Sequence, residues 1–420
     1  MPDKTFTLSL ALAAACVAAS AIPTAVLFAL PAAQTRSATT EVDLVQVAAL
    51  RAQGPEALAR LLAEYDRAPS PVLADTIDLV AAQKYATVSR LYWYTDRSAA
   101  IAAAQQRHVP ILELRLLGRL DEELSCANSR LFRAALYANG DVSALLRQSF
   151  VLLWTTERPV PKVTIDFGDG RTIHTTATGN SAHFVLDERG GVVDVLPGMY
   201  ASGPFRAELV QALAVTRGLD PANAERRAQQ IRTYHEERAE VARIQWEQIA
   251  RPPSGAIIRA LLKNPAGTSV AIAQRLTVSK AYVEIPQLGG LGADPGGLAE
   301  DETAAWAQIA SLHWTDKGKV LDPQATKLVV ALHNGGPVKA TTAELAALLP
   351  RFEQHLLADS ALAEFKLRMQ IHDYLATHAN TYLPLDRFLY TEVFKTPITD
   401  RWLGLLPRTD VTGLPGDGAR

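Results

Sequence analysis

An alternation of strand-like and helix-like segments between residues 85 and 217 is the feature that most constrains the fold. Residues 87–94 and 109–117 are rich in β-branched, leucine and aromatic side chains, whereas residues 97–108 between them are typical of a helix capped by Asp96. A helix is expected to begin near Ser125. Such alternation predicts a mixed sheet with helices on its faces.

A further strand, two hairpins and a helix complete this α/β unit. Residues 149–156 form an apolar run that predicts a buried strand. Residues 162–176 and 182–198 each contain two strand-like runs separated by glycine-bearing turns. A helix that starts after Pro204 is expected to close the unit.

A resemblance to extracytoplasmic thioredoxin-like domains begins at residues 93–112, WYTDRSAAIAAAQQRHVPIL, where a helix precedes a central strand. In that family the redox motif lies at the start of a helix soon after this strand, which is the place of the sequence Cys126-Ala-Asn-Ser129 here. Residues 178–198, TGNSAHFVLDERGGVVDVLPG, resemble the later hairpin of the family. The resemblance covers residues 85–215 and implies a thioredoxin-like domain over residues 85–217.

The chain departs from the family at two positions that matter for its chemistry. Ser129 stands where the second cysteine of the motif is expected, so the motif has the form CxxS. No proline occurs near Asn180, Ser181 and Ala182, where the family has a cis-proline that helps to hold a partner peptide. Because a hydroxyl cannot resolve a mixed disulfide, the resemblance implies monothiol chemistry.

Cys126 is the candidate catalytic residue, together with Ser129. The N–H groups and the dipole at a helix start stabilise an anion such as a thiolate, and Ser129 is expected to donate a hydrogen bond to the sulfur. Asn128, Arg130 and Ser181 are candidate supporting residues. The charge of Arg130 lies one turn along the helix and would add positive potential.

A purely structural interpretation of the same residues competes with the catalytic one. In that interpretation Ser125 is an ordinary N-cap, and Cys126 is a small packed side chain. Asp121, Glu122 and Glu123 precede the helix, and their negative charges oppose a thiolate. The residue pattern therefore leaves both roles of Cys126 open.

Residues 1–38 are expected to be a targeting segment. Residues 6–30 carry no charge and are about as long as a bilayer-spanning helix requires, and a stretch of small and polar residues follows, as near a cleavage site. The segment is either a cleaved signal peptide or a retained membrane anchor. Both alternatives place the rest of the chain outside the cytoplasm, in the periplasm or secreted. Cys126 is then the only cysteine of the exported part, because Cys16 lies in the apolar segment.

Helical patterns fill the remaining regions. Residues 41–84 predict a helical lead-in, residues 218–412 a mainly helical region, and residues 413–420 a flexible tail. Thr341 and Glu344 form a predicted capping box. The long charged helix after Pro221 is expected to turn five side chains inward: Ile231, Tyr234, Val241, Ile244 and Trp246.

Charge and residue spacing exclude several kinds of ligand. The chain has 42 basic and 44 acidic residues and a formal net charge of −2, which is far from the basic field that nucleic-acid binding needs. His174 and His183 lie on successive hairpins, but no carboxylate at a suitable spacing completes a metal site. Neither a metal nor a cofactor is predicted.

Two classes of function follow from these patterns. The first is an extracytoplasmic thioredoxin-like protein with monothiol redox or thiol-exchange activity through Cys126, acting on a protein or a small thiol. The second is a non-catalytic binding or scaffold protein of the cell envelope that uses the thioredoxin-like fold and the helical region for partner recognition. An uncleaved N-terminal segment would add attachment to the membrane.

Overall fold

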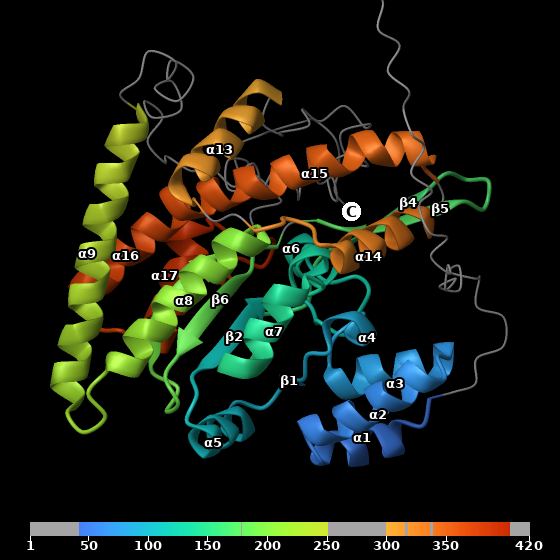
Figure 1. Ribbon diagram of the computed structural model, residues 1–420, viewed down its shortest axis with the longest axis horizontal. Coiled ribbons are helices and arrows are strands. Elements are labelled where there is room, and N and C mark those ends of the chain that lie inside the picture. The colour runs from blue at the N-terminus through green and yellow to red at the C-terminus, as the bar shows by residue number, and fades with distance from the viewer. Residues whose placement is uncertain (1–41, 178, 251–299, 316–317, 337–338, 404–420) are drawn as a thin grey trace, which may run out of the picture. The chain divides into compact units, whose positions relative to one another are not determined.

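The computed structural model describes residues 42–177, 179–250, 300–315, 318–336 and 339–403 (Figure 1). The expectations for residues 1–38 and 413–420 lie outside the described residues. The described residues form one compact unit. None of the helices in the described ranges combines the length and the hydropathy needed to cross a membrane.

A five-stranded mixed sheet forms the centre of the α/β part, as the sequence predicts. The first three strands in spatial order are β1 (Trp93–Tyr94), β3 (Val151–Thr156) and β2 (Ile111–Leu116), and all three run parallel. The hairpin β6 (Ala182–Leu186) and β7 (Val192–Pro197) continues the sheet, with both of its strands antiparallel to their neighbours. The sheet is therefore built around β2.

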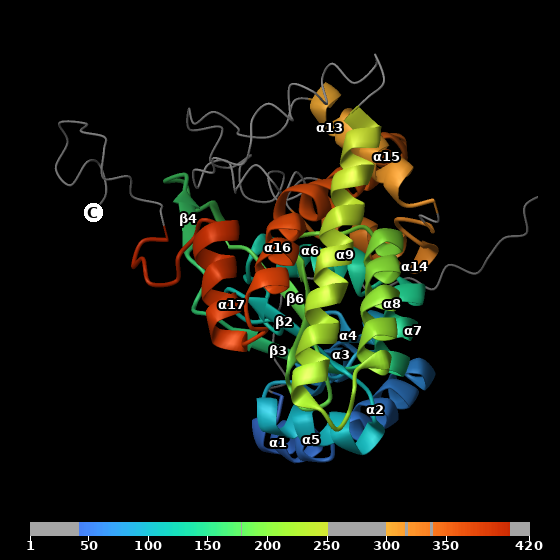
Figure 2. The ribbon, with the colours of Figure 1, turned by 90° about the vertical axis from the view of Figure 1, so that its left-hand side faces the viewer.

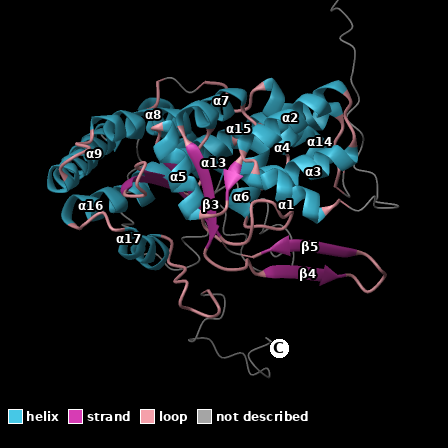
Figure 3. Ribbon diagram, turned by 90° about the horizontal axis from the view of Figure 1, so that it is seen from below, coloured by secondary structure: helices cyan, strands magenta, loops and turns pink. Residues whose placement is uncertain are grey.

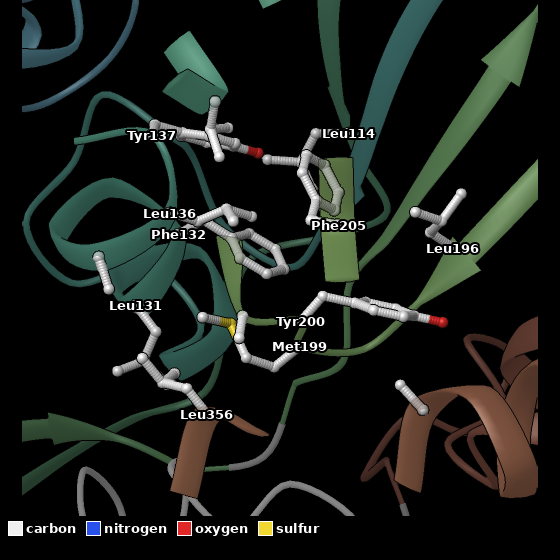
Figure 4. Close-up of a cluster of buried hydrophobic side chains, with 14 of the residues drawn as sticks. Leu114, Leu131, Phe132, Leu136, Tyr137, Leu196, Met199, Tyr200, Phe205 and Leu356 are labelled. Carbon is white, nitrogen blue, oxygen red and sulfur yellow. The ribbon is translucent and has the colours of Figure 1, made fainter. Parts of the chain in front are cut away.

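One face of the sheet carries the larger hydrophobic cluster (Figure 4). Leu112, Leu114 and Leu116 of β2 point to this face, since side chains alternate along a strand. Four helical elements that come after β2 or after β7 in the chain supply residues to the cluster: α6 (Ala127–Leu131), the π-helix η1 (Phe132–Leu136), α7 (Gly140–Ser149) and α8 (Ser202–Gly218). Three helices of the C-terminal half extend the cluster: α13 (Glu300–His313), α14 (Pro323–Asn334) and α15 (Thr342–Leu362).

The opposite face of the sheet carries a second cluster that includes Ile111, Leu153 and Phe184. Besides the strands, five helical elements supply residues to this cluster: α5 (Arg97–Arg107), the π-helix η3 (Ala363–Arg368), α16 (Met369–Thr377), α17 (Tyr382–Phe388) and the π-helix η4 (Leu389–Val393). The long helix α9 (Ala224–Ala250) lies along α16 (Figure 2). The C-terminal helices thus share both hydrophobic clusters with the sheet.

The chain between β3 and β6 forms a small separate sheet of two strands. β4 (Lys162–Asp166) and β5 (Thr172–Thr176) pair antiparallel and extend away from the main sheet (Figure 3). Gly168 and Gly170 have φ of 75° and 88° in the turn, a conformation that favours glycine. The helices α16, α17 and η4, which come much later in the chain, pack on the face of the main sheet that carries the second cluster.

The helical lead-in consists of α1 (Leu44–Ala52), α2 (Pro55–Arg67) and α3 (Pro71–Ala81), which pack around a small core of their own. The Arg51 guanidinium ties this lead-in to the sheet, since it donates to the carbonyl oxygens of Val80 at 2.8 Å and of Trp93 at 3.1 Å.

The prediction of a strand over residues 87–94 is wrong for the first half of that range. Residues Ala86–Ser89 form the short helix α4, and only the two residues of β1 pair in the sheet. The buried Asp78 carboxylate accepts a hydrogen bond from the Ala86 N–H at 2.8 Å and fixes the start of α4. The β-branched residues of α4 are therefore held in a helix by a tertiary contact that overrides their local preference.

Candidate functional site around Cys126

Cys126 occupies the N-cap position of α6, as the sequence predicts for a residue at a helix start. Its backbone N–H donates to the Leu117 carbonyl oxygen at 3.2 Å, which ties the residue to the end of β2. The helix α6 has only five residues before the π-helix η1 begins. The Cys126 side chain is 0% exposed and belongs to the larger hydrophobic cluster.

The sulfur of Cys126 meets the segment that precedes β6. The Sγ atom lies 3.0 Å from the Ser181 Oγ, so the structure brings together these two candidate residues. Gly179 lies against the same cysteine, because a Cβ atom on Gly179 would stand 2.7 Å from the Cys126 Cβ. Contacts this short do not occur between real Cβ atoms, so only glycine fits at position 179.

Ser129 does not act on the sulfur as expected. Its hydroxyl donates to the Cys126 carbonyl oxygen at 2.8 Å, and its Oγ lies 2.6 Å from the Ser125 Oγ. A hydroxyl has a single hydrogen to donate, and its described contacts do not include Sγ. The predicted hydrogen bond from Ser129 to the sulfur is therefore not formed.

The other two supporting residues have different surroundings. The Arg130 guanidinium donates to the Thr176 Oγ1 at 2.9 Å, which connects α6 to the end of β5. Asn128 is completely buried, and within the described part of the chain neither its amide nitrogen nor its amide oxygen has a hydrogen-bond partner. An unpaired buried amide costs about 1–3 kcal/mol of folding free energy.

Arg133, which the sequence analysis did not single out, organises the loop before Cys126. Its guanidinium is 1% exposed and donates to the carbonyl oxygens of Leu120, Glu122 and Glu123, and to the Ser125 Oγ. An arginine between the apolar residues of η1 is the signal that could have indicated a buried charge. Arg133 thereby offsets the carbonyl dipoles of an acidic loop.

His183 lies on β6 in an aromatic environment. Its Nε2 atom is 2.6 Å from the Tyr137 hydroxyl, and the rings of Phe132 and Phe205 pack against it at centroid distances of 4.7 and 4.9 Å. Burial lowers the pKa of His183 to about 3, so the ring is neutral. His174, in contrast, lies on the exposed hairpin and contacts Thr164, so the two histidines belong to different sheets.

A residue of the C-terminal region also reaches the segment over Cys126. The Tyr390 hydroxyl of η4 donates to the Asn180 carbonyl oxygen at 3.4 Å. Tyr390 is completely buried, and burial, followed by the charge of Glu157, raises its pKa well above 10. The cover over the sulfur thus includes residues that lie more than 200 positions apart in the chain.

A second polar cluster, also missed in the sequence analysis, is buried between β7 and the C-terminal helices. The Arg368 guanidinium is 0% exposed and contacts the carboxylates of Asp194, Glu208 and Glu364 at 2.6, 2.6 and 3.0 Å. Arg238 contacts the last two carboxylates at 2.7 and 3.3 Å. Three carboxylates therefore face two guanidinium groups in an interior with little access to water.

The ion pairs set the charges of this cluster against the effect of burial. Burial alone would raise the pKa of Asp194, but Arg368, followed by two neighbouring histidines, holds the pKa below its usual value. The pKa of Glu208 is lowered in the same way, since Arg368 and Arg238 outweigh its burial. Asp194 stands inside the apolar run VVDVLP of β7, and a lone carboxylate in such a run is the sequence signal of a buried ion pair.

Two groups of side chains in the described ranges bring metal-binding atoms within 4.8 Å of one another: Asp194, His235 and His372, and Glu208, His313 and Glu364. Most atoms of the first group already have partners, whereas the buried His372 Nε2 has none among the described residues. The His235 Nε2 lies 2.9 Å from the Val193 carbonyl oxygen and must donate to it, so the His235 Nδ1 accepts from the His372 Nδ1 at 2.7 Å. Arg368 beside Asp194 repels a cation, so the arrangement suits hydrogen bonding better than metal binding.

The carboxylates of the second group are occupied by cations of the protein, whereas the His313 Nδ1 has no hydrogen-bond partner among the described residues. Both carboxylates bind Arg238 and Arg368, and the Trp314 indole donates to Glu208 at 2.9 Å. The geometry around Cys126 and around Arg368 is thus dominated by packing and ion pairing.

No protein-family model matches the chain, and neither does any curated protein or solved structure compared with it.

Proposed function

We propose that the chain is a thioredoxin-like protein of the cell envelope that acts by binding rather than by catalysis, with Cys126 as a structural thiol. The observation that carries the proposal is the burial of Cys126, whose side chain is 0% exposed. Thiol exchange requires the sulfur to reach a partner sulfur in line. Gly179, Ser181 and the residues beneath them occupy the space that a partner would need.

The thioredoxin-like assignment is supported by the order of the elements. Helix α5, the central strand β2, a helix that starts at a cysteine and the later hairpin β6–β7 follow one another as the sequence resemblance implies. Gly179 and Ser181 also lie against Cys126, which is where the family places the residues around its cis-proline. The described residues contain no cis peptide bond.

A monothiol redox protein is the second candidate, and two observations favour it. The Ser181 hydroxyl at 3.0 Å is placed to donate a hydrogen bond to a thiolate. The unpaired amide of Asn128, two residues after Cys126, offers a donor and an acceptor to a bound group. Both groups would serve catalysis only if the segment over the sulfur opened.

The rate at which the Cys126 thiol is alkylated tests the proposal. Full-length protein with Cys16→Ser has a single thiol and can be treated with iodoacetamide at pH 6 to 9, with and without urea. A structural thiol reacts only as fast as the protein unfolds, so the native rate should fall below the rate in urea by a factor of about 100 or more. Native-state reaction at a rate near that of the unfolded chain, with a midpoint at or below pH 7, would overturn the proposal in favour of the redox candidate.

A further inference from the structure

A cleft in the described part of the chain lies between elements other than the helix that begins at Cys126. It has a volume of about 780 Å³, and its walls come from α2, from β1 with the residue before it, and from the ends of α5 and α7. The lead-in helices lie beside the β1 edge of the sheet (Figure 1). Small-molecule sites have volumes in the range of roughly 300–1,000 Å³ and often lie between packed substructures.

Three arginines line this cleft: Arg90, Arg107 and Arg147. The guanidinium of Arg107 donates to the carbonyl oxygens of Phe150 at 3.1 Å and of Arg147 at 3.0 Å, and that of Arg147 donates to the Ser89 carbonyl oxygen at 2.8 Å. Each guanidinium has five N–H groups, so these bonds leave others to meet a ligand. Backbone carbonyl groups thus hold the guanidinium groups of Arg107 and Arg147 at the cleft.

Few negative charges oppose these cations. Arg90 is paired with Asp66, but Arg107 and Arg147 form no ion pair with any described carboxylate. Glu56 is the one acidic residue of the cleft lining. Burial, followed by repulsion from Arg90, lowers the pKa of Arg147, which means that an anion would relieve an unfavourable charge there.

The ends of three helices contribute to the electrostatic potential in the cleft, some with a positive and some with a negative sign. Pro55 and Glu56 of the first turn of α2 line the cleft, and the N-cap of α2 makes no side-chain hydrogen bond, so this helix presents its positive end. The helices α5 and α7 present their negative ends, but Arg107 and Arg147 lie on the last turns of those helices. The guanidinium groups carry whole charges, whereas helix ends carry about half a charge, so the positive sign prevails.

Aromatic and apolar side chains form the rest of the wall. The half-buried rings of Tyr92 and Tyr94 pack edge to face with centroids 5.1 Å apart, and Leu58, Leu62 and Phe150 lie beside them. A ligand of matching chemistry has an aromatic or apolar body and an oxyanion. Guanidinium groups recognise phosphate and carboxylate oxygens through paired N–H donors.

We infer that this cleft binds a small organic oxyanion, with its phosphate or carboxylate at Arg107 and Arg147 and its aromatic body at Tyr92 and Tyr94. The inference rests on the proposed function, since it assigns a class of ligand to a protein that acts by binding. It does not depend on the chemistry of Cys126.

Isothermal titration calorimetry of the full-length protein with three probes tests the inference. Phenyl phosphate carries both features of the ligand, inorganic phosphate only the charge, and benzyl alcohol only the ring. We expect phenyl phosphate to bind at least about 10-fold more tightly than either of the others, and its affinity to fall as salt rises from 50 to 500 mM, because salt screens exposed charges. Equal affinity for phenyl phosphate and benzyl alcohol would overturn the inference.

Variants locate the site. Arg107→Met and Arg147→Met should each lower the affinity for phenyl phosphate about 10-fold or more, whereas Arg171→Met, on the exposed hairpin, should leave it unchanged. Because Arg107 and Arg147 also bind backbone carbonyls, Tyr94→Leu is needed as a variant without that role. This variant should weaken the binding of phenyl phosphate and leave the binding of inorganic phosphate unchanged. Unchanged binding in all three cleft variants would place the anion elsewhere and end the inference.

The two proposals fail separately. If phenyl phosphate does not bind while Cys126 stays protected from alkylation, the inference about the cleft is wrong and the proposed binding function stands. If Cys126 is alkylated rapidly in native protein that still binds phenyl phosphate, the structural role of the thiol is wrong and the inference about the cleft stands.

Discussion

The guanidinium of Arg368 lies 2.6 Å from a carboxylate oxygen of Asp194, and both side chains are completely buried. Arg368 ends the π-helix η3, whereas Asp194 lies on β7 at the edge of the sheet, 174 residues earlier. The pair therefore fixes the C-terminal helices to the sheet at one orientation. A buried ion pair adds little net stability over an apolar pair of equal volume, but removal of one partner leaves the other charge buried.

Arg368→Met is accordingly expected to destabilise the fold strongly. The substitution leaves three buried carboxylates with only Arg238 as a cation, so the free energy of unfolding should fall by about 3–5 kcal/mol. Urea denaturation followed by circular dichroism measures the change. Arg243→Met is the matched control, because Arg243 pairs with Asp373 at side-chain exposures of 47% and 54%. That exposed pair is worth less than about 1 kcal/mol, so similar losses in both variants would contradict the role of Arg368.

Gly179→Ala tests the contact between the loop and Cys126. The new methyl group would overlap the Cys126 Cβ, and Gly179 has a φ of 134° that other residues rarely adopt. We expect a loss of about 1–3 kcal/mol from overpacking and faster alkylation of Cys126 in native protein. Gly168→Ala provides the control for backbone strain alone, since its φ is 75° and nothing lies within 4 Å of the added atom.

A double substitution separates the two causes of that loss. In a Cys126→Gly background the Cβ that meets Gly179 is gone, so Gly179→Ala should cost less by about 1 kcal/mol or more, within the usual range of coupling between touching residues. An identical cost in both backgrounds would mean that backbone strain, and not contact with Cys126, governs position 179.

The sequence predicts the α/β centre of the molecule because its signals are local. The strands β2 and β3 are apolar runs, and both hairpins carry glycine at their turns, so pattern and structure agree. The capping box of Thr341 and Glu344 is also confirmed. These features depend on residues that lie within a few positions of one another.

Features set by distant contacts were not predicted. On α9, Ile231 and Tyr234 face inward as expected, but Val241 and Ile244 are 43% and 45% exposed. The buried stripe follows His235, Ala239 and Ala242 instead, because small residues allow close contact with α16. Trp246, half-buried, stacks on Trp306 at 5.6 Å.

The candidate site shows the same limit. Local sequence predicts that Cys126 begins a helix, but its burial depends on Gly179 and Ser181, which approach it only in the folded sheet. The cleft between α2 and β1 likewise joins residues from positions 55 to 152. No local pattern reports which of these side chains meet, so neither the protection of the sulfur nor the gathering of three arginines at the cleft follows from spacing.

Glu157 should make the protein less stable as the pH rises from 4.5 toward 7. Burial, followed by the nearby charge of Asp386, raises the pKa of Glu157 to about 7, although Arg115 opposes this shift. Between pH 4.5 and about 7 the unfolded chain loses this proton and the folded chain keeps it, so stability falls with rising pH over that window. Glu157→Gln removes the ionisable group. In urea denaturation, the free energy of unfolding of the variant relative to that of the original protein should therefore be higher at pH 7.5 than at pH 4.5.

A pH-independent effect of Glu157→Gln would contradict that assignment. Asp373→Asn is the control, since the carboxylate is 54% exposed in its pair with Arg243 and water screens it.

His183 should produce the opposite dependence at lower pH. Its pKa falls from 6.5 to about 3 on folding because of burial, so between these values the unfolded chain binds a proton that the folded chain excludes. Stability then drops as the pH falls below 6.5, by up to about 1.4 kcal/mol per pH unit for one histidine.

His183→Phe keeps an aromatic ring among Phe132 and Phe205 and removes this proton uptake, although it leaves the Tyr137 hydroxyl unpaired at a cost of about 1–3 kcal/mol. The slope of unfolding free energy against pH from 6.5 to 4 should therefore be shallower in His183→Phe, while the exposed control His174→Gln retains the original slope. A slope that is unchanged in His183→Phe would mean that other groups, such as His235 and His372, whose pKa values burial also lowers, account for all of the acid sensitivity.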